Sequence, residues 1–358
     1  MRIEALTLSD FRNISALSLE WDKGTNLLWG NNAQGKTNIL EALYLCGTTK
    51  SHRGAKDKDM IRVGCDEAHI RMLVSKKDND IRIDMHLKKN KAKGIAINGQ
   101  RVTRASELYG LVSMVFFSPE DLDMIKRGPS ERRSFIDREL SQLDAIYLSD
   151  LTRYQKCLQQ RNKLLHEIAF RPDLIHELDV WDEQLVFYGQ KVIAKRGDFI
   201  RELTETVRRI HTSLTGGKEE IRLIYEPSVS AEGLGDRIQK GRETDLRFQA
   251  TQAGPHRDDM GVMLGQMDCR LYGSQGQQRT SALSLKLSEI DLIRTKRHDD
   301  PILLLDDVLS ELDETRQDYL LSGISQTQTM ITCTGFGDIS RSNFKINKAF
   351  HIVSGGIA

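Results

Sequence analysis

The sequence predicts a mixed α/β fold with an added antiparallel β-layer and an inserted helical domain. Three observations predict it. Two apolar strand patterns frame the α/β part: one leads into the glycine-rich stretch GNNAQGKT at residues 30–37, and the other, PILLLDD, ends in two acids. Alternating apolar and polar residues dominate 68–102. Two long apolar stripes at helical spacing occupy 143–214, so helices interrupt the α/β part along the chain.

The glycine-rich stretch fits the pattern G-x-x-x-x-G-K-[ST] in full. Gly30 and Gly35 let the backbone turn its N–H groups toward phosphate oxygens, and a helix starting near Lys36 adds its positive N-terminal end. We expect Lys36 to neutralise the β- and γ-phosphates of a nucleotide and Thr37 to offer its hydroxyl to Mg²⁺. The predicted nucleotide-binding residues of this segment are Gly30, Asn31, Asn32, Ala33, Gln34, Gly35, Lys36, Thr37 and Asn38.

The two acids that end the second apolar strand are Asp306 and Asp307. We expect Asp306 to hold Mg²⁺, directly or through water, together with Thr37. Asp307 is expected to polarise the attacking water, so the predicted catalytic residues are Asp307 and Lys36. An apolar strand that ends in acids also suits a helix cap, for which Ser310 is a candidate.

Strand patterns predict the antiparallel layer. The stretches RIEALTLSDF and ISALSLEW alternate as half-buried strands do. Further strands fill residues 68–102, and Asn98-Gly99 is a two-residue hairpin signal.

The apolar stripes predict two long helices. The first runs over 143–168 with Arg161 interrupting its apolar face, and the second runs from Leu174 to Leu214 and stops before Gly216-Gly217. The short stretch AFRPD between them favours an antiparallel hairpin, and a first helix of about 26 residues spans about 39 Å. The stripes suit either an ordinary helical subdomain or a protruding arm. The predicted domains are 1–125 and 245–358 for the head and 126–244 for the helical arm.

Composition narrows the protein class. The 358 residues carry a formal net charge of +1, so any basic surface must be local. The five cysteines are scattered without a C-x-x-C pair, which favours reduced thiols over a zinc site or a disulfide framework. No apolar run approaches the roughly 18 residues of a membrane-spanning helix, and the N-terminal stretch lacks a signal-peptide core. We therefore expect a cytoplasmic protein without a membrane partner.

The order of these motifs resembles an ABC-type, SMC-like ATPase head. The phosphate loop is followed by SQGQQ at 274–278, then LLLDD and LSELD. The stretches LTLSDFRN near the N-terminus, FSPEDLDMIKRGPSERRSFID at 117–137 and AGPHRDD at 253–259 extend the likeness over nearly the whole chain. Together they resemble the RecF family of bacterial recombinational repair. The resemblance implies ATP and Mg²⁺ as cofactors.

The resemblance also implies a two-chain working unit. In ABC heads the signature turn caps the γ-phosphate bound by the opposite subunit, and LSELD at 309–313 resembles the loop that crosses this interface. Arg12 and Asn13 match an N-terminal motif near the nucleotide in related heads, although a surface Arg-Asn pair fits the sequence equally well. The implied contacts to the neighbour's nucleotide come from Ser274, Gln275, Gly276 and Gln277.

Three departures from the ABC pattern concern the chemistry. The signature is Ser-Gln-Gly-Gln-Gln, and Asp307 stands where most ABC heads have Glu. Because Asp is one methylene shorter, we expect slow hydrolysis: a weak, DNA-stimulated ATPase acting as a switch. The stretch MITCTGFGD carries no His where ABC heads often have one, and either Thr332 or Thr334 is a candidate substitute.

The implied function is an ATP-dependent DNA-binding switch or clamp in recombinational repair and replication-fork maintenance, including gap repair and SOS induction. It would dimerise on ATP, bind single-stranded, duplex or gapped DNA without sequence preference, and recruit RecR- and RecO-like partners. The alternatives are another ABC-type chromosome or repair ATPase, a transporter ATPase and a metabolic P-loop kinase.

Two further features have competing interpretations. Basic clusters at 52–58, 88–93 and 126–133 and at Arg208-Arg209 suit either DNA phosphates or a solvated face. His256 and Arg257 follow a Gly-Pro pair, which favours a structural turn over a catalytic site.

Overall fold

The computed structural model describes the whole chain except residues 77–78, 105–106, 325–326 and 336–344. The chain divides into two compact units. Unit 1 joins residues 1–121 to residues 289–358, and unit 2 holds residues 122–288. Strand β10 pairs with β9 inside unit 2, so much of the chain after residue 245 packs with the helices. The predicted domain boundaries, 125/126 and 244/245, stay a prediction.

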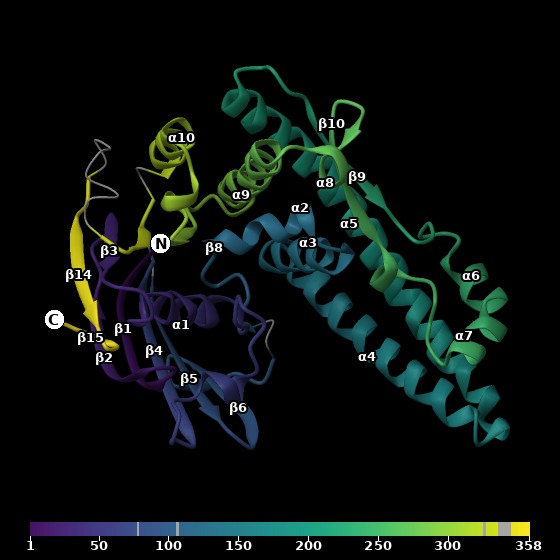
Figure 1. The fold of residues 1–358 in the computed structure, drawn as a ribbon. Helices are drawn as coiled ribbons and strands as arrows, with labels where there is room; N and C mark the ends of the chain where they lie inside the picture. The colour runs from purple at the N-terminus through teal and green to yellow at the C-terminus, as the bar shows by residue number, and fades with distance from the viewer. Residues whose placement is uncertain (77–78, 105–106, 325–326, 336–344) are drawn as a thin grey trace. The chain divides into compact units, whose positions relative to one another are not determined.

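The first sheet of unit 1 is antiparallel and has one face on the core (Figure 1). Side chains of β4 alternate between exposed and buried, as a strand with one solvated face requires. Asn98 and Gly99 connect β6 to β7 with φ angles of 52° and 82°, which a type I′ hairpin turn needs. In spatial order the strands are β2 (Ile14–Glu20), β1 (Arg2–Phe11), β4 (Glu67–Ser75), β5 (Asp80–Lys88), β6 (Lys91–Ile97) and β7 (Gln100–Arg101).

The second sheet of unit 1 is mostly parallel. Its central strands β12 and β13 are buried throughout and mostly apolar, as strands covered on both faces are. Because the strands from β14 to β8 run parallel, their carboxyl ends meet at one edge, where ligands bind in open α/β sheets. In spatial order the strands are β15 (Gly356–Ile357), β14 (Lys348–Val353), β3 (Thr25–Trp29), β13 (Thr329–Cys333), β12 (Ile302–Asp306) and β8 (Met114–Phe117).

Helix α1 (Lys36–Thr48) joins the two sheets of unit 1 into one core. Leu40 and Leu43 on the helix pack in the same apolar cluster as Leu6 of the antiparallel sheet and Leu304 of the parallel sheet. The helix ends at Thr49, which has a φ of 62° and donates its N–H to Leu45 O at 2.8 Å. The other described helical segments that begin in unit 1 are η1 (Asp57–Met60), η3 (Pro119–Leu122), η6 (Leu309–Glu311) and α10 (Glu314–Ile324).

Unit 2 is built on two long antiparallel helices, α4 (Ala145–Ile168) and α5 (Leu178–Thr215). The predicted pair of helices is therefore present, with two shifts at their starts. Asp144 accepts the N–H groups of Ile146 and Tyr147, so the first helix begins at 145 and not at 143. Residues Pro172–Glu177 form a 3₁₀ turn, η4, so the second begins at Leu178.

The other described elements of unit 2 are shorter than the two long helices. Strands β9 to β11 form an antiparallel sheet that the sequence patterns did not predict. The last helix, α9, continues past the end of unit 2 at residue 288. These elements are α2 (Asp123–Lys126), α3 (Pro129–Leu143), β9 (Ile221–Glu226), α6 (Leu234–Lys240), α7 (Arg242–Phe248), η5 (Pro255–Arg257), β10 (Asp259–Leu264), β11 (Met267–Asp268), α8 (Cys269–Tyr272) and α9 (Gln275–Arg297).

Arg161, which interrupts the apolar stripe, is fully buried in unit 2. Its guanidinium donates to Asp182 at 2.5 Å, to Asp245 at 2.7 Å and to Thr251 at 2.8 Å. A buried charge is tolerated only when it is paired and hydrogen-bonded, and these partners come from α5, α7 and the loop after α7. The buried charge thus ties the hairpin to the segments that cover it.

None of the five cysteines, all of which the structure describes, forms a disulfide. Among the described helices, none combines the length and the apolar character that crossing a bilayer requires.

Candidate nucleotide-binding site

The phosphate loop connects β3 to α1 at the carboxyl edge of the parallel sheet. Gly30 and Gly35 have φ angles of 145° and 106°, and a Cβ on Gly30 would lie 2.5 Å from Ile352 O. A Cβ on Gly35 would lie 2.9 Å from the side chain of Asn13. Both positions therefore require glycine for conformation and for space. The helix begins at Lys36, as the loop pattern predicts.

Lys36 folds back over this loop. Its Nζ donates to Gly30 O at 2.6 Å and to Asn31 O at 2.8 Å. Burial lowers the pKa of the ammonium, and the neighbouring acids Asp307 and Asp306 oppose that shift. The charge therefore sits where phosphate oxygens would approach, held by two backbone carbonyls.

Asp306 and Thr37 meet across the sheet edge although they are far apart in sequence. Thr37 Oγ1 donates to Asp306 Oδ1 at 2.8 Å, and Thr332 Oγ1 donates to the same oxygen at 2.8 Å. Burial raises the pKa of the Asp306 carboxyl, and the two hydroxyl hydrogen bonds partly offset this. Hydroxyl and carboxylate oxygens are ligands that Mg²⁺ accepts, so this donor set fits the ion.

Asp307 stands directly after this ligand pair. Its backbone has a φ of 52°, and its N–H donates to Thr332 Oγ1 at 2.9 Å. A non-glycine residue in the left-handed region is uncommon and marks a position that the surrounding structure enforces. The LSELD segment follows at once, and Ser310 donates its hydroxyl to Asp307 O at 2.7 Å. Ser310 thus holds the turn that carries Asp307.

Thr332 and Thr334, the two candidates for the missing His, differ in their surroundings. Thr332 is buried and its hydroxyl joins Asp306 to the backbone of Asp307, whereas Thr334 is exposed. Thr332 therefore orients both acids. Residues Phe336 to Asp338 of the MITCTGFGD stretch lie outside the described residues.

Arg12 and Asn13 lie against the start of α1. Arg12 makes a bidentate pair with the buried carboxylate of Glu41, with both N···O distances at 2.8 Å. Asn13 Oδ1 accepts from Asn38 Nδ2 at 2.8 Å, close to Gly35. Arg12 therefore holds α1 through Glu41, whereas Asn13 and Asn38 lie beside the phosphate loop.

Three groups near the loop have contacts that the sequence did not predict, and one of them, Glu120, was not among the predicted residues. Gln34 fixes the loop to the C-terminal strands, because its side chain accepts from Ser354 N at 2.6 Å and its carbonyl from Gly355 N at 2.9 Å. Arg53 and Glu120 are exposed residues close enough to Asp306 to act on its charge. A signal for Glu120 was available: FSPED directly follows an apolar strand, and β8 pairs in parallel with β12.

The signature turn in unit 2 is a self-capped helix start. Ser274 N donates to Gln277 Oε1 at 2.9 Å, and Gln277 N donates to Ser274 Oγ at 3.3 Å. This reciprocal pair is a capping box, for which S-x-x-Q is the sequence signature. Helix α9 begins at Gln275. Ser274, Gln275 and Gly276 are exposed, so the positive end of a long helix faces solvent within unit 2.

Side chains behind the turn fix its position within unit 2. Gln277 Nε2 donates to Glu219 Oε1 at 2.9 Å, and Gln278 Nε2 donates to Cys269 O at 3.1 Å. A Cβ on Gly273 would lie 2.4 Å from Cys269 O, so the chain must pass that carbonyl as glycine. Gln277 and Gln278 of the signature therefore form hydrogen bonds that stabilise the turn itself.

The AGPHRDD stretch forms a buried turn. His256 Nδ1 lies 2.6 Å from Tyr154 Oη, and Nε2 lies 3.0 Å from Thr251 O. Burial lowers the pKa of this imidazole. Gly254 has a φ of 129°, and a Cβ there would meet Tyr154 Oη at 2.5 Å. Both ring nitrogens are engaged within unit 2, as a structural turn requires.

Comparisons with known proteins agree with this geometry. The family model described as RecF/RecN/SMC N terminal domain matches residues 2–342. The DNA replication and repair protein RecF of Agathobacter rectalis is 57% identical over 357 residues, covering 100% of this chain and 99% of that protein. A solved structure of the recombination mediator protein RecF with ATP, in the RecFOR pathway, is 35% identical with a TM-score of 0.92, covering 99% of this chain and 96% of that one.

A more distant solved structure supports the architecture alone. An Smc head bound to the C-terminal winged-helix domain of ScpA is 15% identical, with a TM-score of 0.57, over 99% of this chain and 96% of that one. The predicted ABC-type head with an inserted helical domain is thereby confirmed as a fold. The family match, the full-length identity and the shared architecture lead to one conclusion: the chain belongs to the RecF family of DNA replication and repair proteins.

Proposed function

We propose that this protein is an ATP-switched DNA clamp that works as a homodimer in recombinational repair. The observation that carries the proposal is the contact between Thr37 and Asp306 at 2.8 Å beside the loop of Lys36. It joins the phosphate loop to an acid at the end of a neighbouring parallel strand, as nucleotide-dependent switches need. Each further step of the proposal has its own support.

ATP binding rests on the loop and its helix. The N–H groups of the loop and the start of α1 would receive the phosphates, and Lys36 would exchange its bonds to Gly30 O and Asn31 O for phosphate oxygens. Thr37 and Asp306 would hold Mg²⁺, which when bound supplies positive charge to the phosphates. The RecF structure solved with ATP supports the same ligand for this chain.

Dimerisation rests on the signature turn. The phosphate loop of unit 1 already has the residues that a chain needs to bind its own nucleotide. The exposed start of α9 is therefore not needed for that binding. Its positive end suits the γ-phosphate of a nucleotide held by a second copy, contacted through Ser274, Gln275, Gly276 and Gln277. ATP would then hold two chains together, and hydrolysis would release them.

Asp307 is the proposed general base for a slow hydrolysis. Thr332 and Ser310 form hydrogen bonds with the backbone of Asp307 and fix its position. Its side chain is one methylene shorter than that of Glu, so the carboxylate extends less far toward the attacking water. Proton transfer requires hydrogen-bond contact with the attacking water, and a shorter side chain meets that requirement less often. Slow turnover suits a switch whose ATP-bound state must persist.

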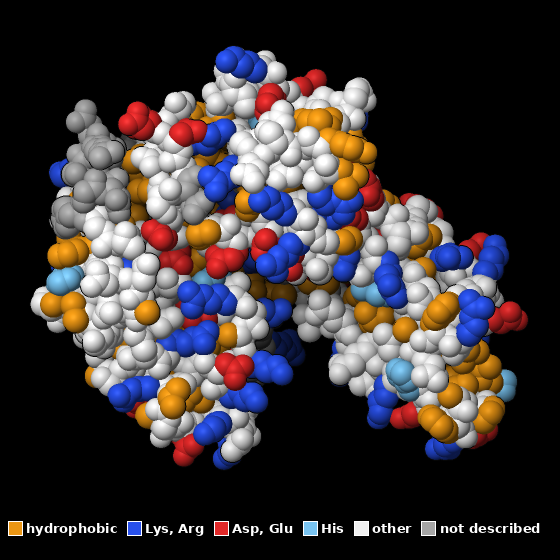
Figure 2. All heavy atoms as spheres, viewed as in Figure 1, with side chains coloured by type: hydrophobic (Ala, Val, Ile, Leu, Met, Phe, Trp, Pro, Cys, Tyr) orange, Lys and Arg blue, Asp and Glu red, His pale blue; other side chains and the backbone are white. Residues whose placement is uncertain are grey.

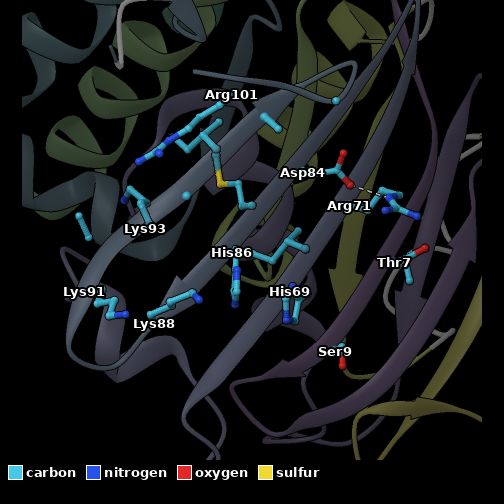
Figure 3. A pocket seen from close by; sticks show the side chains of 17 residues that line it. Thr7, Ser9, His69, Arg71, Asp84, His86, Lys88, Lys91, Lys93 and Arg101 are labelled. Atoms are coloured by element: carbon cyan, nitrogen blue, oxygen red, sulfur yellow. Dashed lines mark hydrogen bonds and ion pairs between the residues drawn. The ribbon is translucent and has the colours of Figure 1, made fainter. Parts of the chain in front are cut away.

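DNA contact is proposed for a basic groove on the exposed face of the antiparallel sheet. Lys88, Lys91 and Arg101 line it, from the KKNKAK cluster and the strand beyond (Figure 3). The ammonium group of Lys93, from the same cluster, is instead paired with Asp57. In Figure 2, blue Lys and Arg side chains gather over the part of unit 1 where Figure 1 draws β5 and β6. Such contacts bind phosphates without reading sequence and weaken with salt.

RecR- and RecO-like proteins are the proposed partners, and the support is the family. The solved RecF structures belong to a pathway named for RecF, RecO and RecR. Recruitment to gapped DNA would follow from an ATP-bound dimer that stays on DNA long enough to be recognised. A metabolic kinase or transporter role has no support from these relatives.

Sedimentation with and without ATP tests the proposed function. The wild type should sediment as a monomer without nucleotide and as a dimer with ATP, whereas Lys36→Arg should stay monomeric. A gel-shift series over single-stranded, duplex and gapped DNA, with ATP and with ADP, then measures the clamp. A wild type that stays monomeric with saturating ATP would sink the proposal.

A further inference from the structure

Two histidines and a glutamate gather on the exposed face of the antiparallel sheet, away from the phosphate loop. Glu67 and His69 lie two residues apart on β4, and His86 lies on β5 (Figure 3 shows the two imidazoles side by side). One ligand atom from each residue can be chosen so that all lie within 4.8 Å of one another. Nothing in the ATP switch uses them.

The distances in this cluster suit a shared ion. Glu67 Oε2 lies 2.5 Å from His86 Nε2 and 3.9 Å from His69 Nε2. Two donors bound to zinc at about 2.0–2.1 Å and at the tetrahedral angle are about 3.3 Å apart, between these two values. The imidazole centroids are 4.0 Å apart with planes 25° from parallel, so both rings present Nε2 toward the same carboxylate oxygen. Small side-chain rotations would complete the coordination.

The sheet fixes the three residues on a rigid base. His69 is directly opposite His86, and Glu67 is directly opposite Lys88, in a nine-pair register between β4 and β5. The alternate residues on the other face, among them Ile70 and Met85, are buried in the core. Ligands on paired strands keep their spacing without help from a loop.

The neighbouring strands leave room at the cluster. Gly94 of β6 pairs with His86, so no side chain covers that imidazole from the β6 side. Ser9 of β1 pairs with His69 and adds only a hydroxyl. A fourth ligand position is therefore open to water or to the Ser9 hydroxyl, and partly open sites of this kind exchange their ion with solvent.

The charges around the cluster divide between the two carboxylate oxygens. Lys88 Nζ lies 3.4 Å from Glu67 Oε1, which leaves Oε2 to the imidazoles. Arg71, next along the exposed face of β4, is paired with Asp84 at 2.6 Å. Lys88 is thus the nearest cation that a bound ion would meet.

We propose that Glu67, His69 and His86 form a binding site for one divalent transition-metal ion of the zinc type. Two imidazoles and one carboxylate favour Zn²⁺, Ni²⁺ or Cu²⁺ over Mg²⁺, which prefers oxygen ligands. The site is separate from Thr37 and Asp306 and independent of ATP binding. It goes beyond the proposed function, because neither the switch nor DNA contact requires it.

Co²⁺ absorption of the nucleotide-free full chain tests the site, with excess Mg²⁺ to keep Co²⁺ from the oxygen ligands of Thr37 and Asp306. The wild type should bind one Co²⁺ with visible d–d bands, and Zn²⁺ should displace it. His69→Ala and His86→Ala should each weaken binding by at least about a hundredfold, more than the roughly 10–100-fold loss from an outer-shell change. His166→Ala, an exposed histidine on α4, is the matched control and should bind as the wild type does.

Two more variants test whether a nearby charge affects the bound ion and whether Cys65, two residues before Glu67, is a ligand instead. Lys88→Met removes the nearest cation and should tighten Co²⁺ binding severalfold, and Cys65→Ser should leave the spectrum unchanged. Zn²⁺ should raise the melting temperature of the wild type and not that of His69→Ala/His86→Ala, because an ion that binds only the folded chain stabilises it. The proposal fails if the wild type shows no Co²⁺ bands, if the double variant binds as tightly, or if Cys65→Ser abolishes the bands.

Discussion

The phosphate loop in unit 1 and the signature turn in unit 2 are both glycine-containing helix starts, yet their surroundings differ. At the loop, Lys36 and Asp306 are buried, and hydrogen bonds involving three other segments, β12, β13 and the turn after β14, converge there. At the signature turn, Ser274 and Gln277 cap each other, and the first residues of α9 face solvent within unit 2. The loop brings together a lysine, a hydroxyl and a carboxylate for a nucleotide and its metal ion, whereas the hydrogen bonds at the signature turn hold the turn itself in place.

This difference explains why a single chain would form an incomplete switch. A nucleotide in the loop would meet Lys36, Thr37 and Asp306 of its own chain. The signature turn offers a positive helix end and a hydroxyl but no lysine and no metal ligand, so it can cap a phosphate and cannot bind a nucleotide alone. The comparison predicts that variants at the two starts separate ATP binding from dimerisation.

The largest expected effect is on hydrolysis. If Asp307 is the general base, Asp307→Asn should slow phosphate release by about 10²–10⁴-fold while ATP still binds, because the amide keeps the size of the side chain but not its basicity. The dimer should then persist with ATP. Single-turnover phosphate release, run beside sedimentation, measures both, and an unchanged rate would remove Asp307 from the chemistry.

Arg161→Ala should give the next largest effect, confined to unit 2. It leaves the carboxylates of Asp182 and Asp245 buried without their central cation, which costs about 3–5 kcal/mol. Hydrogen exchange should quicken along α4 and α5, and ATP binding by unit 1 should persist. Lys156→Ala, at an exposed lysine on the same helix, is the control and should change stability by no more than about 0.5 kcal/mol. Equal loss of protection in both units would contradict the division drawn here.

Lys36→Ala should weaken ATP binding by at least about a hundredfold, since hydrogen bonds to charged groups contribute about 1.5–3 kcal/mol each. A fluorescent ATP analogue measures the affinity at equilibrium. Lys91→Ala, an exposed lysine of the same unit, should bind ATP as the wild type does. ATP-dependent dimers formed by Lys36→Ala would show that the loop is not the ligand site.

The smallest expected effect is a pH dependence of the free energy of unfolding, through His52 in unit 1. Burial beside Phe116 lowers the pKa of His52 from 6.5 to about 4 in the folded chain. The unfolded chain takes up the proton first, so the contribution of His52 to stability is present above pH 6.5 and is lost as the pH falls toward 4. Urea unfolding of the wild type should weaken more than that of His52→Phe across this window. Parallel curves would mean that His52 titrates in the folded chain as it does when unfolded.

Local features of this molecule were predictable from sequence. The eight residues of the phosphate loop lie together, so their pattern carries the turn, the helix start and the lysine at once. The paired apolar stripes likewise predicted α4 and α5, and Asn98-Gly99 predicted the hairpin between β6 and β7.

Long-range pairings were not predictable in the same way. Thr332 and Thr334 were equivalent in sequence, and only the register that sets Asp306 beside Thr332 separates them. Glu41 follows Arg12 by 29 residues, and no local pattern announces a bidentate pair over that separation. The partners of Arg161 were equally unpredictable. In the sequence Arg161 only interrupts an apolar helix face, and its partners come from segments much later in the chain. Asp144 moved a helix start because capping chemistry outweighs apolar periodicity at a terminus.

The central claim is that the signature turn acts on the nucleotide of a second chain, and Ser274→Arg tests it most directly. ATP affinity and sedimentation are measured on the same preparation, with Ser274→Ala as the mild variant that loses only the cap. Ser274→Arg should bind ATP as tightly as the wild type and remain monomeric with ATP. If Ser274→Arg loses ATP binding together with dimerisation, the turn serves its own chain's nucleotide and the claim is contradicted.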